Sequence, residues 1–308
     1  MTIALRLIGA ALGRLVPVLA VISVLVFSIV HWIPGDPAVV AAGLEASPAT
    51  VEAIRRDLGL DRPLPQQYLH FVSRAVRGDF GVSIRTGAPV GAEILDRLPH
   101  TIVLAGGGVA LAVSLGLVIG IAAALSRRVL VDRALSAASL VSASTPSYWL
   151  ALMLMLLFSL TLGWLPAIGV GSPLHYVLPS VALGLQSAGA VARMTRASVR
   201  EVLGQEFLRA AAAKGVPPRR VLLVHALRNA ILPVVSLVGL RIGGLLAGTV
   251  LVESVFAVPG VGRMMADAVV ARDFPVVQGG VLVVATMVVV VNGITDVVAG
   301  ALDPRVRA

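Results

Sequence analysis

Six long apolar stretches are the feature that most constrains the fold of this chain. They cover residues 15–33, 101–125, 134–162, 176–192, 229–252 and 276–302. A helix needs about 20 mostly apolar residues to cross the hydrocarbon core of a bilayer. Within these stretches the charged residues are Arg241 and Asp296, one in each of the last two. We therefore predict an all-α, polytopic membrane protein with six transmembrane helices.

The third stretch belongs to an uncharged run that continues to residue 174, which is too long for one helix. Glycines and prolines from Gly163 to Pro173 interrupt the second part of this run. Both residue types disfavour helix interiors, so we expect one helix to about Leu162 and then a loop. The first stretch could be a signal peptide, but it is long and no small-residue cleavage site follows closely. We expect it to be a retained span.

The distribution of charge predicts how the chain crosses the membrane. With the N-terminus in the cytoplasm, the cytoplasmic segments hold fifteen basic and four acidic residues, and the external segments hold nine basic and eleven acidic residues. Cytoplasmic loops of membrane proteins carry the excess of Lys and Arg. We therefore expect both termini to be cytoplasmic and membrane lipid to surround the helices. The formal net charge of +9 then requires no nucleic acid as a partner.

The segment between the first two predicted spans, residues 34–100, is the one sizeable polar piece, and we call it the insert. Ser47 followed by Pro48 is typical of a helix N-cap with proline at the first helical position. Two more short helices are predicted over residues 65–78 and 89–98. The insert is too small for a core of its own, so we expect it to cap the external end of the bundle. The predicted domains are an N-terminal span over residues 1–33, the insert over residues 34–100, and a transmembrane core over residues 101–308.

Motifs for common enzyme chemistry are absent from the sequence. The single lysine, Lys214, does not belong to a G-x-x-x-x-G-K-[ST] loop, so the chain has no standard cradle for nucleotide phosphates. There is no cysteine, and no two of the five histidines lie three to five residues apart. We predict no catalytic residue, no metal and no cofactor in this chain, which is therefore not expected to be an enzyme.

The most informative stretch lies between the fourth and fifth predicted spans, at residues 193–228, and it contains eight basic residues. Helical spacing over residues 193–214 places a set of residues on one side: Val199, Val202, Leu203, Phe207 and Ala210. Gly215 is typical of the position just after a helix, and the prolines at 217 and 218 prevent continuation. The pattern predicts a short cytoplasmic helix with a small alanine face. Such a helix suits docking into a groove of a partner, or lying on anionic lipid.

This stretch, from Glu206 to Arg220, resembles the EAA loop of binding-protein-dependent ABC importer permeases, and more closely the B-type permease of the dipeptide, oligopeptide and nickel family. Further motifs occur in the order of that family: residues 33–37 (IPGDP), 58–64 (LGLDRPL), 77–81 (RGDFG), 97–99 (RLP), 144–149 (STPSYW), 163–166 (GWLP), 178–179 (LP), 225–229 (HALRN), 259–262 (PGVG) and 303–307 (DPRVR). Together they extend the resemblance over most of the chain.

The resemblance implies a permease subunit that forms half of the pathway for di- or oligopeptide uptake across the plasma membrane of a prokaryote. It implies a second homologous permease, two cytoplasmic ATPase subunits that hold ATP and Mg, and an external substrate-binding protein. The implied ATPase-binding residues are Glu206, Phe207, Arg209, Ala210, Ala211, Lys214 and Gly215. In this set Arg209 stands where the family has glutamate, and the interval from Gly215 to Pro233 is longer than in the general pattern.

Arg241 is the most informative single residue within a predicted span. It lies about 12 residues, or roughly 18 Å, from the inner end of that span. A charge at such depth usually faces a bundle interior or a water-filled path. We expect Arg241, Gly244 and Gly248 to share a face that lines the substrate pathway, where the arginine would attract a substrate carboxylate. The alternatives are an ion pair with Asp296 and local polar packing. The opposite face, which suits close helix packing, contains Gly239, Gly243 and Ala247.

Other functions remain as alternatives. The same machinery could import nickel or another small solute, and the external binding protein would discriminate between these substrates. A secondary transporter should carry paired carboxylates within the membrane or an inverted repeat, and neither is evident. An intramembrane hydrolase would need a nucleophile and a base, and the sequence offers no plausible pair.

Overall fold

The computed structural model describes residues 13, 16–28, 32, 38–39, 47–57, 59–126 and 129–302. Within this part of the chain the regular elements are helices, and an isolated β-bridge joins Val82 to Pro89. The predicted all-α class is confirmed. Several features of the sequence lie outside the described residues: the N-terminal Arg6 and Arg14, the motif at residues 33–37, Arg127 and Arg128, and the motif at residues 303–307.

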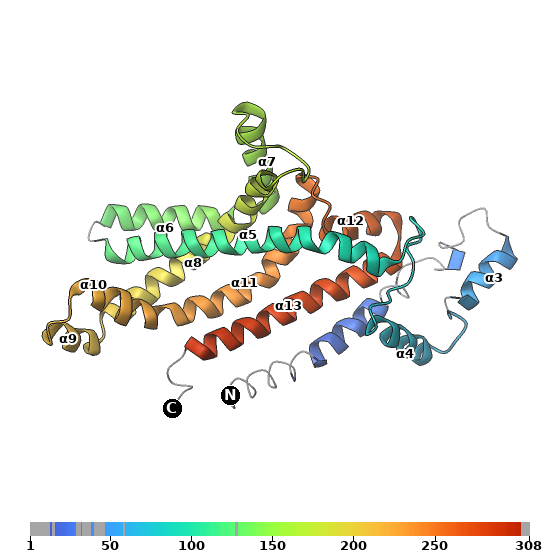
Figure 1. Cartoon of the computed structure of the whole chain (residues 1–308), viewed down its shortest axis with the longest axis horizontal. Helices are drawn as coiled ribbons and strands as arrows, with labels where there is room; N and C mark the ends of the chain where they lie inside the picture. The colour runs from blue at the N-terminus through green and yellow to red at the C-terminus, as the bar shows by residue number, and fades with distance from the viewer. Residues whose placement is uncertain are drawn as a thin grey trace.

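The helices are arranged along one long axis (Figure 1). The insert contributes α3 (Pro48–Asp57) and α4 (Leu64–Ala75). The rest of the chain contributes α5 (Val90–Leu125), α6 (Val129–Ser144), α7 (Ser147–Leu154), α8 (Val177–Leu203), α9 (Glu206–Ala213), α10 (Pro218–Arg220), α11 (Leu227–Val255), α12 (Val261–Ala271) and α13 (Phe274–Leu302). Two π-helical stretches, Met155–Thr161 and Val221–Ala226, and a 3-10 helix, Pro173–Tyr176, adjoin these helices. In Figure 1, α9 lies at one end of the molecule, and α3, α4 and α12 lie at the other.

Three helices are long and apolar enough to cross a membrane: Val90–Leu125, Pro218–Val255 and Phe274–Ala301. A fourth candidate is the pair Arg133–Ser144 and Ser147–Thr161, which is bent by 103°. The described part of the first predicted span is a shorter apolar helix, Val16–Ser28. By length and composition the described residues thus give three or four candidate spans, and the chain is polytopic.

Two predicted helices differ from the structure, although the predicted end of the third span near Leu162 is confirmed. The third helix of the insert and the second span are one helix, α5, because Pro99 removes a single hydrogen bond without ending the helix. The third span is not straight. Pro146 is extended, with ψ of 136°. The residue before a proline disfavours the helical region, so α6 ends before Pro146 and meets α7 at a sharp bend.

Small residues allow α5 and α8 to pack closely. Gly108, Gly116 and Gly120 recur on the buried side of α5. A Cβ at Gly116 would lie 2.5 Å from the Val191 side chain, and one at Gly120 would lie 2.5 Å from the Thr195 side chain. Lipid chains are as apolar as leucine, so helices in membranes associate largely through such close packing. Because α8 lies among α5, α6, α7 and α11, it is the most buried of the long helices.

The insert contains one predicted helix cap, on α3, and packs on the bundle through α4. The Ser47 hydroxyl accepts a hydrogen bond of 3.2 Å from the Thr50 N–H, which confirms the predicted N-cap of α3. On α4, Tyr68 bonds to Ser23 at 2.9 Å and makes an edge-on ring contact with Phe27. These contacts hold α4 against the helix Val16–Ser28, as Figure 1 also shows.

Candidate functional site

The basic connection between α8 and α11 forms the end of the molecule farthest from α3 and α4 (Figure 1). The predicted single helix over residues 193–214 is wrong, because a turn at Gly204 and Gln205 separates α8 from α9. Glycine is unfavourable in helix interiors. The N–H groups of Gly204 and Gln205 bond to carbonyls three residues earlier, at 3.2 and 3.0 Å, and this tighter turn redirects the chain.

The end of α9 is formed as predicted. Gly215 adopts a left-handed φ of +81°. The Val216 N–H donates to the Ala211 carbonyl five residues earlier, at 3.2 Å. A left-handed glycine with this bond is the Schellman ending of a helix, which satisfies carbonyls that would otherwise lack partners. Pro217 then precedes α10, so the chain leaves α9 in a fixed direction.

One leucine attaches α9 to the bundle. Leu208 is 4% exposed and packs in a cluster with Val199, Val202, Ala226 and Ala230. The sequence predicted that Phe207 and Ala210 share one side of a helix with Val199 and Val202. This shared side is not formed, because the turn at Gly204 interrupts the helical spacing. Phe207 is instead 41% exposed.

The seven predicted ATPase-binding residues lie together on α9 and at its end. Six are exposed, namely Glu206, Phe207, Arg209, Ala210, Lys214 and Gly215, and Ala211 is half-buried. The face therefore combines one aromatic side chain, small alanines and charges at its edges. Glu206 lies in the first turn, where the helix dipole favours a negative charge. Most of this face is therefore open in this chain.

The predicted pathway residues lie on a more open side of α11. Arg241 and Gly244 are exposed, and a Cβ at Gly244 would meet nothing within 4 Å. Gly248 is half-buried, and a Cβ there would lie 3.2 Å from Leu183. Among the residues that the structure describes, Arg241 forms no ion pair with Asp296. The ion-pair alternative is therefore not formed in this structure.

The opposite side of α11 packs against α13, as predicted for two of three residues. A Cβ at Gly239 would lie 2.5 Å from Thr295, and one at Gly243 would lie 3.4 Å from Val288. The prediction is wrong for Ala247, which is exposed.

Sequence reasoning missed a buried carboxylate near the end of α11. Glu253 is fully buried, and its two oxygens accept hydrogen bonds from the Thr101 hydroxyl at 2.7 Å and the Arg263 N–H at 2.9 Å. It lies one residue beyond the predicted span, so it was counted among external charges. The Pro-Gly pair at residues 259–260 could have indicated a tight turn close to this carboxylate.

A second missed carboxylate attaches the insert to the core. Asp273 directly precedes α13 and is 2% exposed. It accepts hydrogen bonds from the Ser83 hydroxyl at 2.5 Å and from the N–H groups of Ile84 and Arg85 at 3.1 and 3.2 Å. The three donors belong to the insert, so this one side chain fixes its last loop on the bundle.

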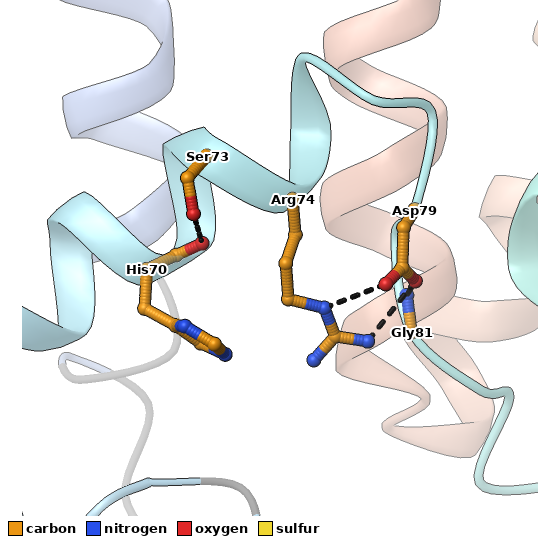
Figure 2. Close-up of polar contacts among 5 residues, drawn as sticks. All are labelled: His70, Ser73, Arg74, Asp79 and Gly81. Atoms are coloured by element: carbon orange, nitrogen blue, oxygen red, sulfur yellow. Dashed lines mark hydrogen bonds and ion pairs between the residues drawn. The ribbon is translucent and has the colours of Figure 1, made fainter.

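The turn after α4 is held by an ion pair (Figure 2). Arg74 donates to both carboxylate oxygens of Asp79, with Nε–Oδ2 at 2.8 Å and Nη2–Oδ1 at 3.0 Å. The Gly81 N–H donates to the same carboxylate at 3.0 Å. The hydrogen bonds from Arg74, and then from Gly81, lower the pKa of Asp79 to about 2. Asp79 is therefore ionised at physiological pH, as the ion pair with Arg74 requires.

These features define an all-helical polytopic membrane protein with a polar insert at one end and a short, largely exposed helix, α9, at the other. Residues 116–308 match the family model described as binding-protein-dependent transport system inner membrane component, and residues 3–105 match the model of its N-terminal part. The chain belongs to this family and is the permease subunit of an ABC importer, not an enzyme.

Relatives match nearly the whole chain. The glutathione transport system permease protein GsiC of Pectobacterium atrosepticum is 44% identical over 302 residues, which cover 98% of this chain and 97% of the relative. The protein of the same name from Escherichia coli strain K12 is 43% identical with the same coverage. Inward-facing structures of the methionine ABC transporter MetNI share the fold, with TM-scores of 0.54 and 0.59, 17% identity, and coverage of 68% of this chain and 96% of the other.

Proposed function

We propose that this permease forms half of the membrane pathway of an importer for short peptides, with glutathione and di- or oligopeptides as the substrate class. The support is the 44% identity to a glutathione transport permease over nearly the full length of both chains. A second homologous permease would complete the pathway, and an external binding protein would deliver the substrate. Import of nickel or another small solute is the second candidate, because the dipeptide, oligopeptide and nickel family that the sequence resembles includes such systems.

The proposed topology has six spans with both termini in the cytoplasm of a prokaryotic cell. The spans are the helix that contains Val16–Ser28, α5, the bent pair α6 and α7, α8, α11 and α13. In this arrangement the insert is external and α9 is cytoplasmic. The support is that α9 and the insert lie at opposite ends of the molecule, as the distribution of Arg and Lys requires (Figure 1).

We further propose that α9 couples the permease to its ATPases. ATP and Mg would bind the two partner subunits, and this chain would contribute Glu206, Phe207, Arg209, Ala210, Ala211, Lys214 and Gly215, of which all but Ala211 are exposed. The observation that carries this proposal is the attachment of α9 by Leu208, because a helix fixed to the bundle on one side can transmit motion received on the other. Closure of the ATPases would move α9, and the spans would follow as alternating access.

Arg241, Gly244 and Gly248 are the proposed pathway residues. An exposed arginine within a spanning helix is costly toward lipid but favourable toward a water-filled path. Facing the second permease, Arg241 would attract the carboxylate of a peptide.

The test is reconstitution of this chain with its partner permease, ATPases and binding protein in proteoliposomes. We expect ATP-dependent uptake of labelled glutathione that unlabelled di- and tripeptides compete with, and loss of uptake when residues 206–215 are deleted. Uptake of Ni²⁺ without peptide competition would favour the second candidate. Uptake without the ATPases would contradict the proposed function.

A further inference from the structure

Four elements meet at Glu253. The carboxylate belongs to α11, and the Thr101 hydroxyl that donates to it at 2.7 Å belongs to α5. The same Thr101 oxygen accepts a hydrogen bond of 2.9 Å from the Val261 N–H, at the first residue of α12. The turn between α11 and α12 also accepts a hydrogen bond, because the Gly169 N–H donates to the Phe256 carbonyl at 3.0 Å. The outer ends of three helices and one loop are thus joined around one buried side chain.

The turn between α11 and α12 is shaped to this carboxylate. A Cβ at Gly260 would overlap the Glu253 carboxylate, and a Cβ at Gly262 would lie 2.9 Å from its Oε2. α12 begins immediately after Gly260, which has no side chain with which to cap it. The Glu253 oxygen bonds instead to the N–H of Arg263, in the first turn of α12. The N–H groups in the first turn of a helix have no acceptor within the helix, so the carboxylate supplies one for Arg263. The helix dipole also favours a negative charge at this end.

A purely structural contact could be made with apolar side chains at lower cost, because burial of a charge is unfavourable. Among the described residues, Glu253 has no cationic partner, since the Arg263 side chain lies 4.0 Å from Asp267 instead. The same turn contains Ala257 with a positive φ of 52°, a conformation that costs about 1 kcal/mol or more for a residue with a Cβ. The carboxylate therefore adds side-chain contacts to a turn whose own backbone bonds include Val258 N–H to the Glu253 carbonyl at 2.9 Å.

We propose that Glu253 is a positioning residue that locks this turn, so that the outer ends of α5 and α11 move together with α12 as a single body during the transport cycle. The inference goes beyond the proposed function but rests on it for the existence of that cycle. α12 packs on the bundle through Met264 and Ala268 and leaves Val270 87% exposed. A lock at its first turn therefore fixes the direction of the whole short helix.

The chain contains no cysteine, so the lock can be tested with pairs of spin labels at introduced cysteines in the full reconstituted importer. The labels would replace Leu95 on α5 and Val270 on α12, which are 69% and 87% exposed. We expect one narrow distance distribution that is the same without nucleotide and with ATP and vanadate. A shift of this distance between the two states would overturn the proposal.

Thr101→Val removes the hydroxyl but keeps the shape, and Thr101→Ser keeps the hydroxyl. We expect Thr101→Val to broaden the distance distribution and to lower uptake per ATP hydrolysed by about tenfold, as loss of a buried hydrogen bond to a charge predicts. Thr101→Ser should restore both. Glu253→Gln, which keeps the shape and loses one acceptor, should broaden the distribution less. The matched control is Thr286→Val, because the Thr286 hydroxyl bonds only within its own helix, to the Leu282 carbonyl at 2.7 Å.

An unchanged distribution in Thr101→Val would overturn the proposal, even if uptake falls. The label distance does not depend on the substrate. Absence of peptide uptake by the unmodified complex would therefore count against the proposed function, while the lock would still be judged on the distances.

Discussion

Gly189 on α8 lies directly against the backbone carbonyl of Ser139 on α6, and a Cβ at position 189 would overlap that oxygen. One turn later, Arg193 donates to the same carbonyl at 2.8 Å. Because Gly189 has no side chain, α6 can lie close to α8. The hydrogen bond from Arg193 then stabilises this close contact. The contact thus fixes the position of α6 along α8.

We predict that Gly189→Ala separates α6 from α8 and destabilises the protein by about 1–3 kcal/mol, the usual cost of overpacking. The measurement is the thermal midpoint of the detergent-purified subunit. Gly106→Ala on α5 is the matched control, because a Cβ there would meet nothing within 4 Å. It should leave the midpoint unchanged or raise it, since alanine favours helices. Equal midpoints for both variants would contradict the packing argument.

Asp273→Ala should release the loop at residues 83–85 from the core. The change leaves one buried hydroxyl and two partly buried N–H groups without their acceptor, at a cost of about 1–3 kcal/mol. Hydrogen exchange at the amides of Ile84 and Arg85 should become faster, while exchange in α5 stays slow. Asp267→Ala is the control, because Asp267 is half exposed and pairs with Arg263 at only 4.0 Å. Unchanged protection in Asp273→Ala would show that the loop is held by something else.

The Arg74–Asp79 pair should be insensitive to pH in the physiological range. Arg74 lowers the pKa of Asp79 from 3.8 to about 2, so the stabilising contribution is complete above pH 4 and is lost as the pH falls through 2. Tryptic cleavage after Arg77 in the adjacent turn should therefore proceed with a rate that reflects only the protease between pH 6 and 8. Asp79→Asn should accelerate this cleavage, and Asp61→Asn, elsewhere in the insert, should not. A rate for the unmodified protein as fast as that of Asp79→Asn would contradict the prediction.

Phe207→Ala should weaken binding of the ATPase subunits by about tenfold or more, because an exposed aromatic residue within a small-residue face is a typical hot spot. Co-purification of the ATPases with the permease measures this directly. Val269→Ala, an exposed apolar residue on α12 at the opposite end, should have no effect. Leu208→Ala should also lower binding, but together with the thermal midpoint, because it removes a buried anchor. Full co-purification with Phe207→Ala would remove α9 as the docking face.

Arg241→Gln should lower uptake of peptides with a free carboxylate more than uptake of the corresponding amides, by roughly the tenfold factor of a lost charge contact. Arg241→Lys should retain part of the preference, because it keeps the charge. The matched control is Arg228→Gln, at the start of α11. An equal loss for acids and amides would contradict carboxylate attraction and favour a packing role.

Local signals in the sequence were reliable where the structure depends on neighbouring residues. The cap at Ser47 and the left-handed ending at Gly215 need only a few adjacent residues, and both were predicted. The bend at Pro146 was visible as a proline, but the uncharged run around it concealed its effect. Hydropathy alone does not distinguish a straight span from two helices that meet at 103°.

The two buried carboxylates could not be predicted, because their partners are distant in the sequence. Thr101 lies 152 residues from Glu253, and Ser83 lies 190 residues from Asp273. In a list of charges both carboxylates resemble ordinary loop residues. Only the fold brings them to hydroxyl and N–H donors, and only there do their roles become apparent.

The length of α5 has a mechanical consequence. Its 36 residues extend over about 54 Å, whereas the hydrocarbon core is about 30 Å thick. Even at a tilt of about 20°, a long portion stands outside the bilayer. The insert is therefore continuous with a single long helix, and the other half of this helix packs tightly against α8. A soluble protein that binds the insert would therefore act on one end of α5. A force applied there would be transmitted along the helix to the glycine contacts between α5 and α8.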